Sequence, residues 1–132
     1  MSINKNNNKD ISSAAGPDEL VNEVIGAIQD VKGSKITRID MSKIDNPPAP
    51  CFVICQGKST TQVSAIADNI EKVMHENYGI KPNNIDGMRN SQWIIADYGS
   101  MLVHIFLPET RELYNLEELW SDAEITEIED ID

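Results

Sequence analysis

The sequence predicts an α/β fold, a single domain in which helices flank a mixed sheet of four to five strands. Three observations support this prediction. The chain has 132 residues, the length of one domain. Two stretches carry apolar residues at helical spacing, and four shorter stretches alternate in polarity or are apolar throughout. Together with a last short helix, these stretches follow the order α-β-β-α-β-β-α along the chain.

The first half of the predicted domain is a helix followed by two strands. Pro17 suits an early helical position, and one apolar stripe follows it, made of Leu20, Val21, Val24, Ile25 and Ile28. Residues 35–41 alternate in polarity and are rich in β-branched side chains, which predicts a strand. Residues 51–56 are almost all apolar, which is typical of a central strand covered on both faces.

The second half begins with a helix that we expect to run to about Tyr78. Ser59 can cap its N-terminus, and Gln62 completes an S-x-x-Q capping box. Its apolar stripe consists of Val63, Ile66, Ala67, Ile70, Val73 and Met74. Strands are predicted at 93–97 and 101–107, joined by a turn in which Gly99 permits a positive φ. A short acidic and aromatic helix follows Pro108.

Both ends of the chain differ in composition from the domain. Residues 1–16 are polar and rich in asparagine, so we expect a disordered extension there. The folded domain is predicted over residues 17–123, and residues 124–132 are expected to be an acidic tail without fixed geometry. The sequence has no run of about 18 apolar residues, and its first twenty residues lack the apolar centre of a signal peptide. We therefore expect a cytoplasmic protein that has no membrane partner.

The formal net charge of −11 is concentrated near the C-terminus. Residues 109–132 contain ten acidic side chains and one basic one, Arg111, so this part carries −9 and residues 1–108 carry −2. Such a chain is repelled by the phosphates of nucleic acid and gains nothing from counterion release. We therefore expect no DNA partner, and a basic protein as the electrostatic partner.

The two cysteines predict neither a disulfide nor a metal site. Cys51 and Cys55 are four residues apart on a predicted strand, which separates their α-carbons by about 13 Å, beyond the roughly 7 Å limit for a disulfide. The two histidines are distant in sequence, and no pair of residues has the spacing of a zinc site. We expect buried, reduced thiols, no bound metal and no cofactor.

Two motifs are similar to parts of enzyme active sites. Gly57-Lys58-Ser59-Thr60 lies between a strand and a helix, as the end of a P-loop does, but Phe52 stands where a P-loop has its first glycine. Nucleotidyl transfer would need two carboxylates spaced D-x-D on a strand, whereas the strands offer Asp40 and Asp97 singly. We predict no catalytic residues. A nucleotide-binding or nucleotidyltransferase-like enzyme that uses the turn Gly57–Ser59 is the alternative.

Trp93 and His104 each allow two interpretations. His104 alternates with Leu102 and Phe106 along a predicted strand, where a histidine is usually structural, although a role in binding stays open. Trp93 opens a strand, so its indole can belong to the core or stand in solvent as an anchor for a partner. The pattern by itself favours the core.

Three motifs follow one another between residues 62 and 120. They are Q-V-x-x-I-A-D on the second helix, D-Y-G at 97–99 with V-H-I-F at 103–106, and R-x-x-Y-x-L-E-x-L-W from Arg111 to Trp120. On these motifs the chain resembles the ribosomal silencing factor family, RsfS, also called Iojap-like, from about Asp18 to Ala123. The resemblance implies a nucleotidyltransferase-like fold that has lost its catalytic carboxylates.

The same resemblance implies a function and a contact surface. Members of this family are expected to bind the large ribosomal subunit on ribosomal protein number fourteen, to block joining of the small subunit and so to repress translation. Self-association into a homodimer is also consistent with it. Glutamates at 109, 112, 117 and 118 would face basic side chains of the partner. The implied contact residues are Trp93, Asp97, Tyr98, His104, Pro108, Arg111, Tyr114 and Leu116.

Overall fold

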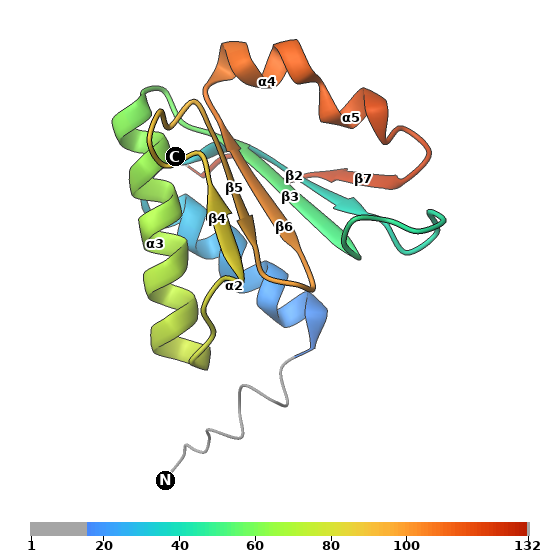
Figure 1. The fold of residues 1–132 in the computed structure, drawn as a ribbon, viewed down its shortest axis with the longest axis horizontal. Helices are drawn as coiled ribbons and strands as arrows, with labels where there is room; N and C mark the ends of the chain where they lie inside the picture. Colours follow the sequence, from blue (N-terminus) through green and yellow to red (C-terminus); the bar gives the residue numbers. More distant parts are fainter. Residues whose placement is uncertain (1–15, 132) are drawn as a thin grey trace, which may run out of the picture.

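The computed structural model describes residues 16–131, which form one six-stranded mixed sheet with helices on both faces (Figure 1). The predicted α/β class and the single domain are confirmed, and the sheet is larger than expected. The predicted disorder of the N-terminal extension concerns residues that, apart from Gly16, lie outside the described part. The elements are α2 (Pro17–Asp30), β2 (Ser34–Asp40), β3 (Cys51–Gln56), α3 (Thr60–Tyr78), β4 (Asn84–Asp86), β5 (Trp93–Asp97), β6 (Leu102–Phe106), α4 (Pro108–Tyr114), α5 (Leu116–Leu119) and β7 (Glu124–Glu127).

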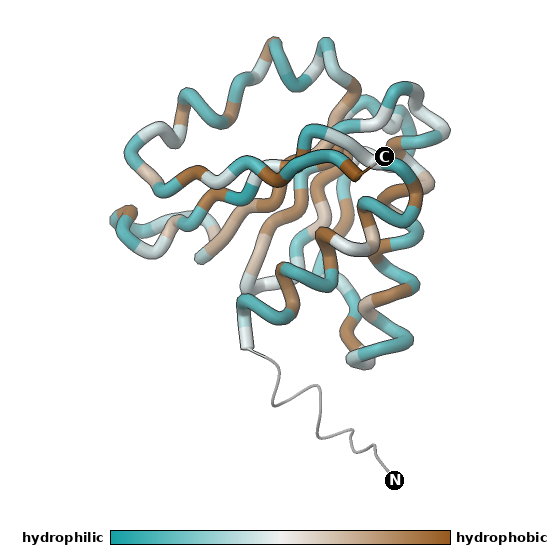
Figure 2. Tube along the Cα trace, turned by 180° about the vertical axis from the view of Figure 1, so that it is seen from behind, coloured by the Kyte–Doolittle hydropathy of each residue, from teal (hydrophilic) through white to brown (hydrophobic). Residues whose placement is uncertain are grey.

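The strands lie in the order β4-β5-β6-β3-β2-β7, and β3–β6 is the parallel pair while the other neighbours are antiparallel. As predicted, β3 is a central strand, buried on both faces except at Gln56. In Figure 2 the inner strands are brown along most of their length, whereas the helices change between teal and brown from turn to turn. This is the colouring expected of a sheet covered on both sides by amphipathic elements.

Helices α2 and α3 cover one face of the sheet, which we call the helical face (Figure 1). Most of the predicted stripe of each helix is buried there, from Val21 to Ile28 on α2 and from Val63 to Met74 on α3. The predicted Ser59 cap of α3 is confirmed, because its hydroxyl accepts a hydrogen bond from the amide of Gln62 at 3.1 Å. The Gln62 side chain accepts from the amide of Lys58 at 2.6 Å, and not from that of Ser59 as a capping box requires. Gly79 ends α3 with φ of 66°.

The opposite face of the sheet, which we call the second face, has a smaller core. Side chains of the strands pack there with Leu116 of α5 and with Trp120, both from the C-terminal third of the chain. Helices α4 and α5 lie across one end of this face (Figure 1). On β5 the side chains of this face, Trp93, Ile95 and Asp97, are only partly buried. The second face is therefore less completely covered on its β5 side than the helical face.

Strands β4 and β7 were not predicted from the sequence. The prediction that residues 124–132 form a tail without fixed geometry is wrong, because this segment contains β7. Residues 124–127 form β7, which pairs with β2, and Ile128 then donates its amide to the carbonyl of Ile36 at 2.8 Å. All four residues of β7 are exposed, so no burial pattern marks it, and two of them are glutamates, a residue type that disfavours edge-to-edge pairing. Strand β4 has three residues and one partly buried side chain, Ile85. Neither strand carries the period-two apolar pattern that sequence analysis detects.

Candidate protein interface

Six aromatic rings form a continuous cluster on the second face, with members from the sheet and from the C-terminal helices. Ring centroids of Trp93 and Tyr114 are 4.6 Å apart, and those of Trp93 and Phe106 are 5.0 Å apart. At the other end of the cluster, the ring centroid of Phe52 is 4.9 Å from that of His104 and 5.9 Å from that of Trp120. The structure therefore brings three of the predicted contact residues, Trp93, His104 and Tyr114, into one group.

Trp93 is partly buried, so its indole belongs in part to the core and in part to the surface. One side of the ring packs against the small core of the second face, and its Nε1–H donates to Nδ1 of His104 at 3.2 Å. Tyr114, which covers another part of the ring, is itself 51% exposed. Trp93 can thus stabilise the fold and still offer apolar surface to a partner.

His104 is buried and neutral. Burial lowers its pKa to about 4, although the nearby charge of Glu117 acts in the opposite direction. Because Nδ1 accepts the hydrogen bond from Trp93, the proton of the neutral ring lies on Nε2. This buried Nε2 has no hydrogen-bond partner within the described chain, an arrangement that costs about 1–3 kcal/mol.

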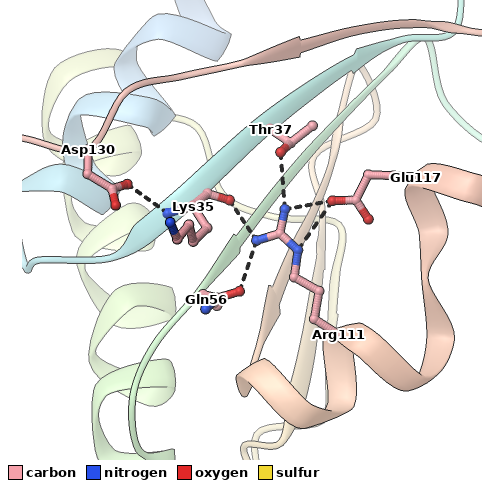
Figure 3. Close-up of polar contacts among 6 residues, drawn as sticks. All are labelled: Lys35, Thr37, Gln56, Arg111, Glu117 and Asp130. Carbon is pink, nitrogen blue, oxygen red and sulfur yellow. Dashed lines mark hydrogen bonds and ion pairs between the residues drawn. The ribbon is translucent and has the colours of Figure 1, made fainter.

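Arg111 holds α4 against strands β2 and β3 of the sheet (Figure 3). Its Nε and Nη2 donate to the carboxylate of Glu117, at 3.3 Å and 2.6 Å, and Nη2 also donates to the Thr37 hydroxyl at 3.1 Å. Its Nη1 donates to the carbonyl of Lys35 at 2.6 Å and to Oε1 of Gln56 at 3.2 Å. All five N–H donors of the guanidinium are thus used within the protein. We call this arrangement the Arg111 clasp.

Two predicted contact residues, Asp97 and Tyr98, lie at the opposite end of β5 from Trp93. Asp97 accepts a hydrogen bond from the amide of Gly99 at 2.8 Å, which stabilises the turn. Tyr98 packs on the helical face, where burial raises its pKa to about 12 with a smaller effect from Glu71 of α3. The structure therefore does not join Tyr98 to the aromatic cluster.

The remaining predicted residues differ in accessibility. Pro108 is exposed at the first position of α4, and Leu116 is 8% exposed within the small core. Sequence analysis overlooked two exposed leucines of the same helices, Leu113 and Leu119, which are 76% and 68% exposed. A signal for them exists, because the segment from Leu113 to Trp120 contains more large apolar residues than one side of a short helix can bury.

Acidic side chains surround the exposed part of α4 and α5. Glu109, Glu112 and Glu118 are exposed, and Glu117 is partly buried in its ion pair with Arg111. Because Arg111 is neutralised in the clasp, the outer surface of these helices is acidic. Three of the four glutamates expected to face a basic partner are thus exposed, whereas Glu117 is paired with Arg111.

Two amides of the turn Gly57–Ser59, the alternative phosphate site, donate hydrogen bonds within the protein. The amide of Gly57 donates to the carbonyl of Phe106 at 3.0 Å, and the amide of Lys58 donates to Oε1 of Gln62 at 2.6 Å. These amides are not free to surround a diphosphate as those of a P-loop do. In residues 16–131 no group of three acidic, cysteine or histidine side chains is placed to hold a metal ion.

Both cysteines are buried, as predicted. Cys51 and Cys55 are free and buried, and burial raises the pKa of both thiols, that of Cys55 to about 12. They are therefore unreactive core side chains. Among the described helices, none is both long and apolar enough to cross a membrane.

The family model described as ribosomal silencing factor during starvation, RsfS, matches residues 14–132. The chain belongs to the RsfS family. The predicted family resemblance is thereby confirmed, and its extent is corrected, because the match includes the acidic segment after Ala123 that we expected to be an addition to the domain. This agrees with β7 being the edge strand of the sheet beside β2.

Other members of the RsfS family and related proteins are similar over most of the chain. A ribosomal silencing factor RsfS from Halalkalibacterium halodurans is 36% identical over 113 residues, which cover 86% of this chain and 95% of that protein. A crystal structure of a Chromobacterium violaceum protein has a TM-score of 0.77 and 29% identity, covering 81% of this chain and 88% of that one. A mouse protein named mitochondrial assembly of ribosomal large subunit protein 1 is 36% identical over 89 residues, 62% of this chain and 39% of the mouse protein.

Proposed function

We propose that this RsfS-family chain binds the free large ribosomal subunit in the cytoplasm and sterically blocks its joining with the small subunit. The binding partner within that subunit is ribosomal protein number fourteen. The observation that carries the proposal is the aromatic cluster of the second face, whose Trp93 and Tyr114 reach the surface beside acidic helices. Aromatic anchors dominate protein interfaces, and acidic neighbours fit the basic surface of a ribosomal protein. The name of the mouse relative, which refers to the large subunit, also supports it.

Repression in this proposal needs no catalysis. The relatives are named as silencing factors, the amides of Gly57 and Lys58 donate within the protein, and the aromatic cluster contains no nucleophile beside a base. A thermal-shift measurement with nucleotides and Mg²⁺ checks this part. Binding at a hundred times the dissociation constant would add about 2.7 kcal/mol of stability, so an unchanged melting temperature is expected.

The central experiment mixes the protein with separated ribosomal subunits and follows sedimentation. We expect co-migration with large subunits and a reduced yield of joined ribosomes when small subunits are then added. Tyr114→Ala should weaken co-migration by about tenfold or more, since an exposed interface tyrosine contributes about 2 kcal/mol. Glu71→Gln, on the exposed side of α3, is the matched surface control. If the wild-type protein fails to sediment with large subunits at moderate salt, the proposed function is wrong.

Electrostatic attraction gives this proposal a second signature. Acidic residues of α4 and α5 should speed the encounter with a basic ribosomal protein, so the association rate should fall as salt is raised. Replacing Glu109 and Glu112 by glutamine should reduce both the association rate and its salt dependence, with a smaller effect on dissociation. Stopped-flow measurements with labelled protein would separate the two rates.

A further inference from the structure

The surface of α4 and α5 exposes an unusual amount of apolar side chain. Six large hydrophobic residues are exposed in the described chain, and three of them, Leu113, Tyr114 and Leu119, lie within seven consecutive residues of these helices. Neither leucine belongs to a core cluster. Grouped apolar exposure of this kind marks an interaction surface more often than a chance arrangement.

The exposure of Leu113 follows from a break in the helix. In an unbroken helix Leu113, Leu116 and Trp120 would share one face, because they are spaced by three and four residues. Asn115 has a positive φ of 45° and separates α4 from α5. As a result, Leu116 and Trp120 pack against the sheet while Leu113 remains 76% exposed.

The Arg111 clasp keeps this arrangement in place. Arg111 on α4 is bonded to Glu117 on α5 and to β2 and β3 through Lys35, Thr37 and Gln56 (Figure 3). The relative positions of the two helices are therefore set before any partner arrives. A preorganised apolar surface loses less entropy on binding than a flexible one.

Charge indicates the chemistry of the occupant. Glu112 directly precedes Leu113 and Glu118 directly precedes Leu119, and Glu109 and Asp122 lie on the same segment. A second copy of this chain would bring the same acidic residues against them, which is unfavourable. A surface with apolar side chains among lysines and arginines complements both the leucines and the glutamates.

We infer that Leu113 and Leu119 anchor the surface of α4 and α5 to a lysine- and arginine-rich protein surface of the large ribosomal subunit. Tyr114, which follows Leu113 on α4, belongs to the aromatic cluster, because its ring centroid is 4.6 Å from that of Trp93. The inference rests on the proposed function and adds to it two residues that extend the contact from the sheet onto the helices.

The test compares two variants in a binding titration with purified large subunits. The double variant Leu113→Ser/Leu119→Ser should bind at least about tenfold more weakly than wild type, and its melting temperature should be nearly unchanged because both side chains are exposed. Ile131→Ser is the matched control, since Ile131 is 62% exposed and lies beyond β7. It should bind as wild type does.

The outcomes separate the inference from the proposed function. If Tyr114→Ala loses affinity but the double variant binds like wild type, the two leucines are not anchors and the inference is overturned while the proposed function stands. If wild type binds no large subunits, the proposed function fails first. If the double mutation converts a dimer of the free protein into a monomer in analytical ultracentrifugation, the occupant is a second copy and the inference is also overturned.

Discussion

The indole N–H of Trp93 donates to Nδ1 of His104 at 3.2 Å, across the antiparallel strands β5 and β6. This bond requires a neutral imidazole whose Nδ1 carries no proton. Protonation would place a hydrogen on Nδ1, break the bond with Trp93 and leave a charge in an apolar cluster. Burial in this cluster disfavours the protonated ring and lowers the pKa of His104 to about 4.

The first prediction is a loss of stability in mild acid that depends on His104. The unfolded chain takes up a proton near pH 6.5, whereas in the folded protein the pKa is about 4. Between these values the unfolded state binds more protons, so the free energy of unfolding falls as pH falls. The loss of unfolding free energy due to His104 is absent above about pH 6.5, reaches roughly 3 kcal/mol near pH 4 and is constant at lower pH.

Urea denaturation of wild type and His104→Phe at pH 7.5, 5.5 and 4.5 measures this effect. The variant should show a smaller decrease in the free energy of unfolding over this range, because its other titrating groups are those of wild type. Equal decreases in both proteins would show that His104 is not buried as a neutral group.

The second prediction concerns the double role of Trp93. Its ring stacks on Phe106 and contacts Tyr114, so Trp93→Ala should destabilise the fold by about 2–3 kcal/mol, less than a fully buried tryptophan would. Trp93→Phe keeps most of the packing and should lose less than about 1.5 kcal/mol. Chemical denaturation tests the order of the two variants. The packing of the ring makes Trp93→Phe the better variant for binding studies.

The third prediction is that the Arg111 clasp is a coupled unit. Arg111→Gln leaves Glu117 and Thr37 without their donor in a partly buried site, which should cost about 2 kcal/mol. Arg111→Lys keeps the charge but cannot supply five donors, so it should recover less than half of that loss. Thermal denaturation at neutral pH gives both values.

A double-mutant cycle isolates the ion pair within the clasp. Glu117→Gln alone and Arg111→Gln alone should each destabilise, and the double variant should lose at least about 1 kcal/mol less than their sum. Strictly additive losses would mean that the 2.6 Å contact between Arg111 and Glu117 contributes no coupling.

The fourth prediction is that the acidic C-terminal segment is part of the fold. Ending the chain after Ala123 removes β7 and the contact of Ile128 with the main core, so amides of β2 should exchange hydrogen faster and the melting temperature should fall. Ending the chain after Asp130 keeps β7 and is the control, since it also retains the hydrogen bond that Asp130 accepts from the amide of Lys35. An unchanged exchange rate in β2 after the longer deletion would contradict the role of β7.

The sequence by itself determined the elements whose signals are local. Four features depend on neighbours within a few residues, and each was predicted close to its observed place. They are the apolar stripes of α2 and α3, the Ser59 cap, the apolar strand β3 and the turn at Gly99. The family motifs were also readable, because they are short and ordered along the chain.

Only the tertiary structure decided which side chains are free. Arg111 was predicted to be a contact residue. Its guanidinium instead donates to Lys35, Thr37, Gln56 and Glu117, most of which are far away in sequence. Tyr98 turns to the helical face, Leu113 is left in solvent by the break at Asn115, and β7 exists because β2 offers it an edge. Periodicity reports a residue's side of its own element, but burial and bonding depend on which distant segment packs there.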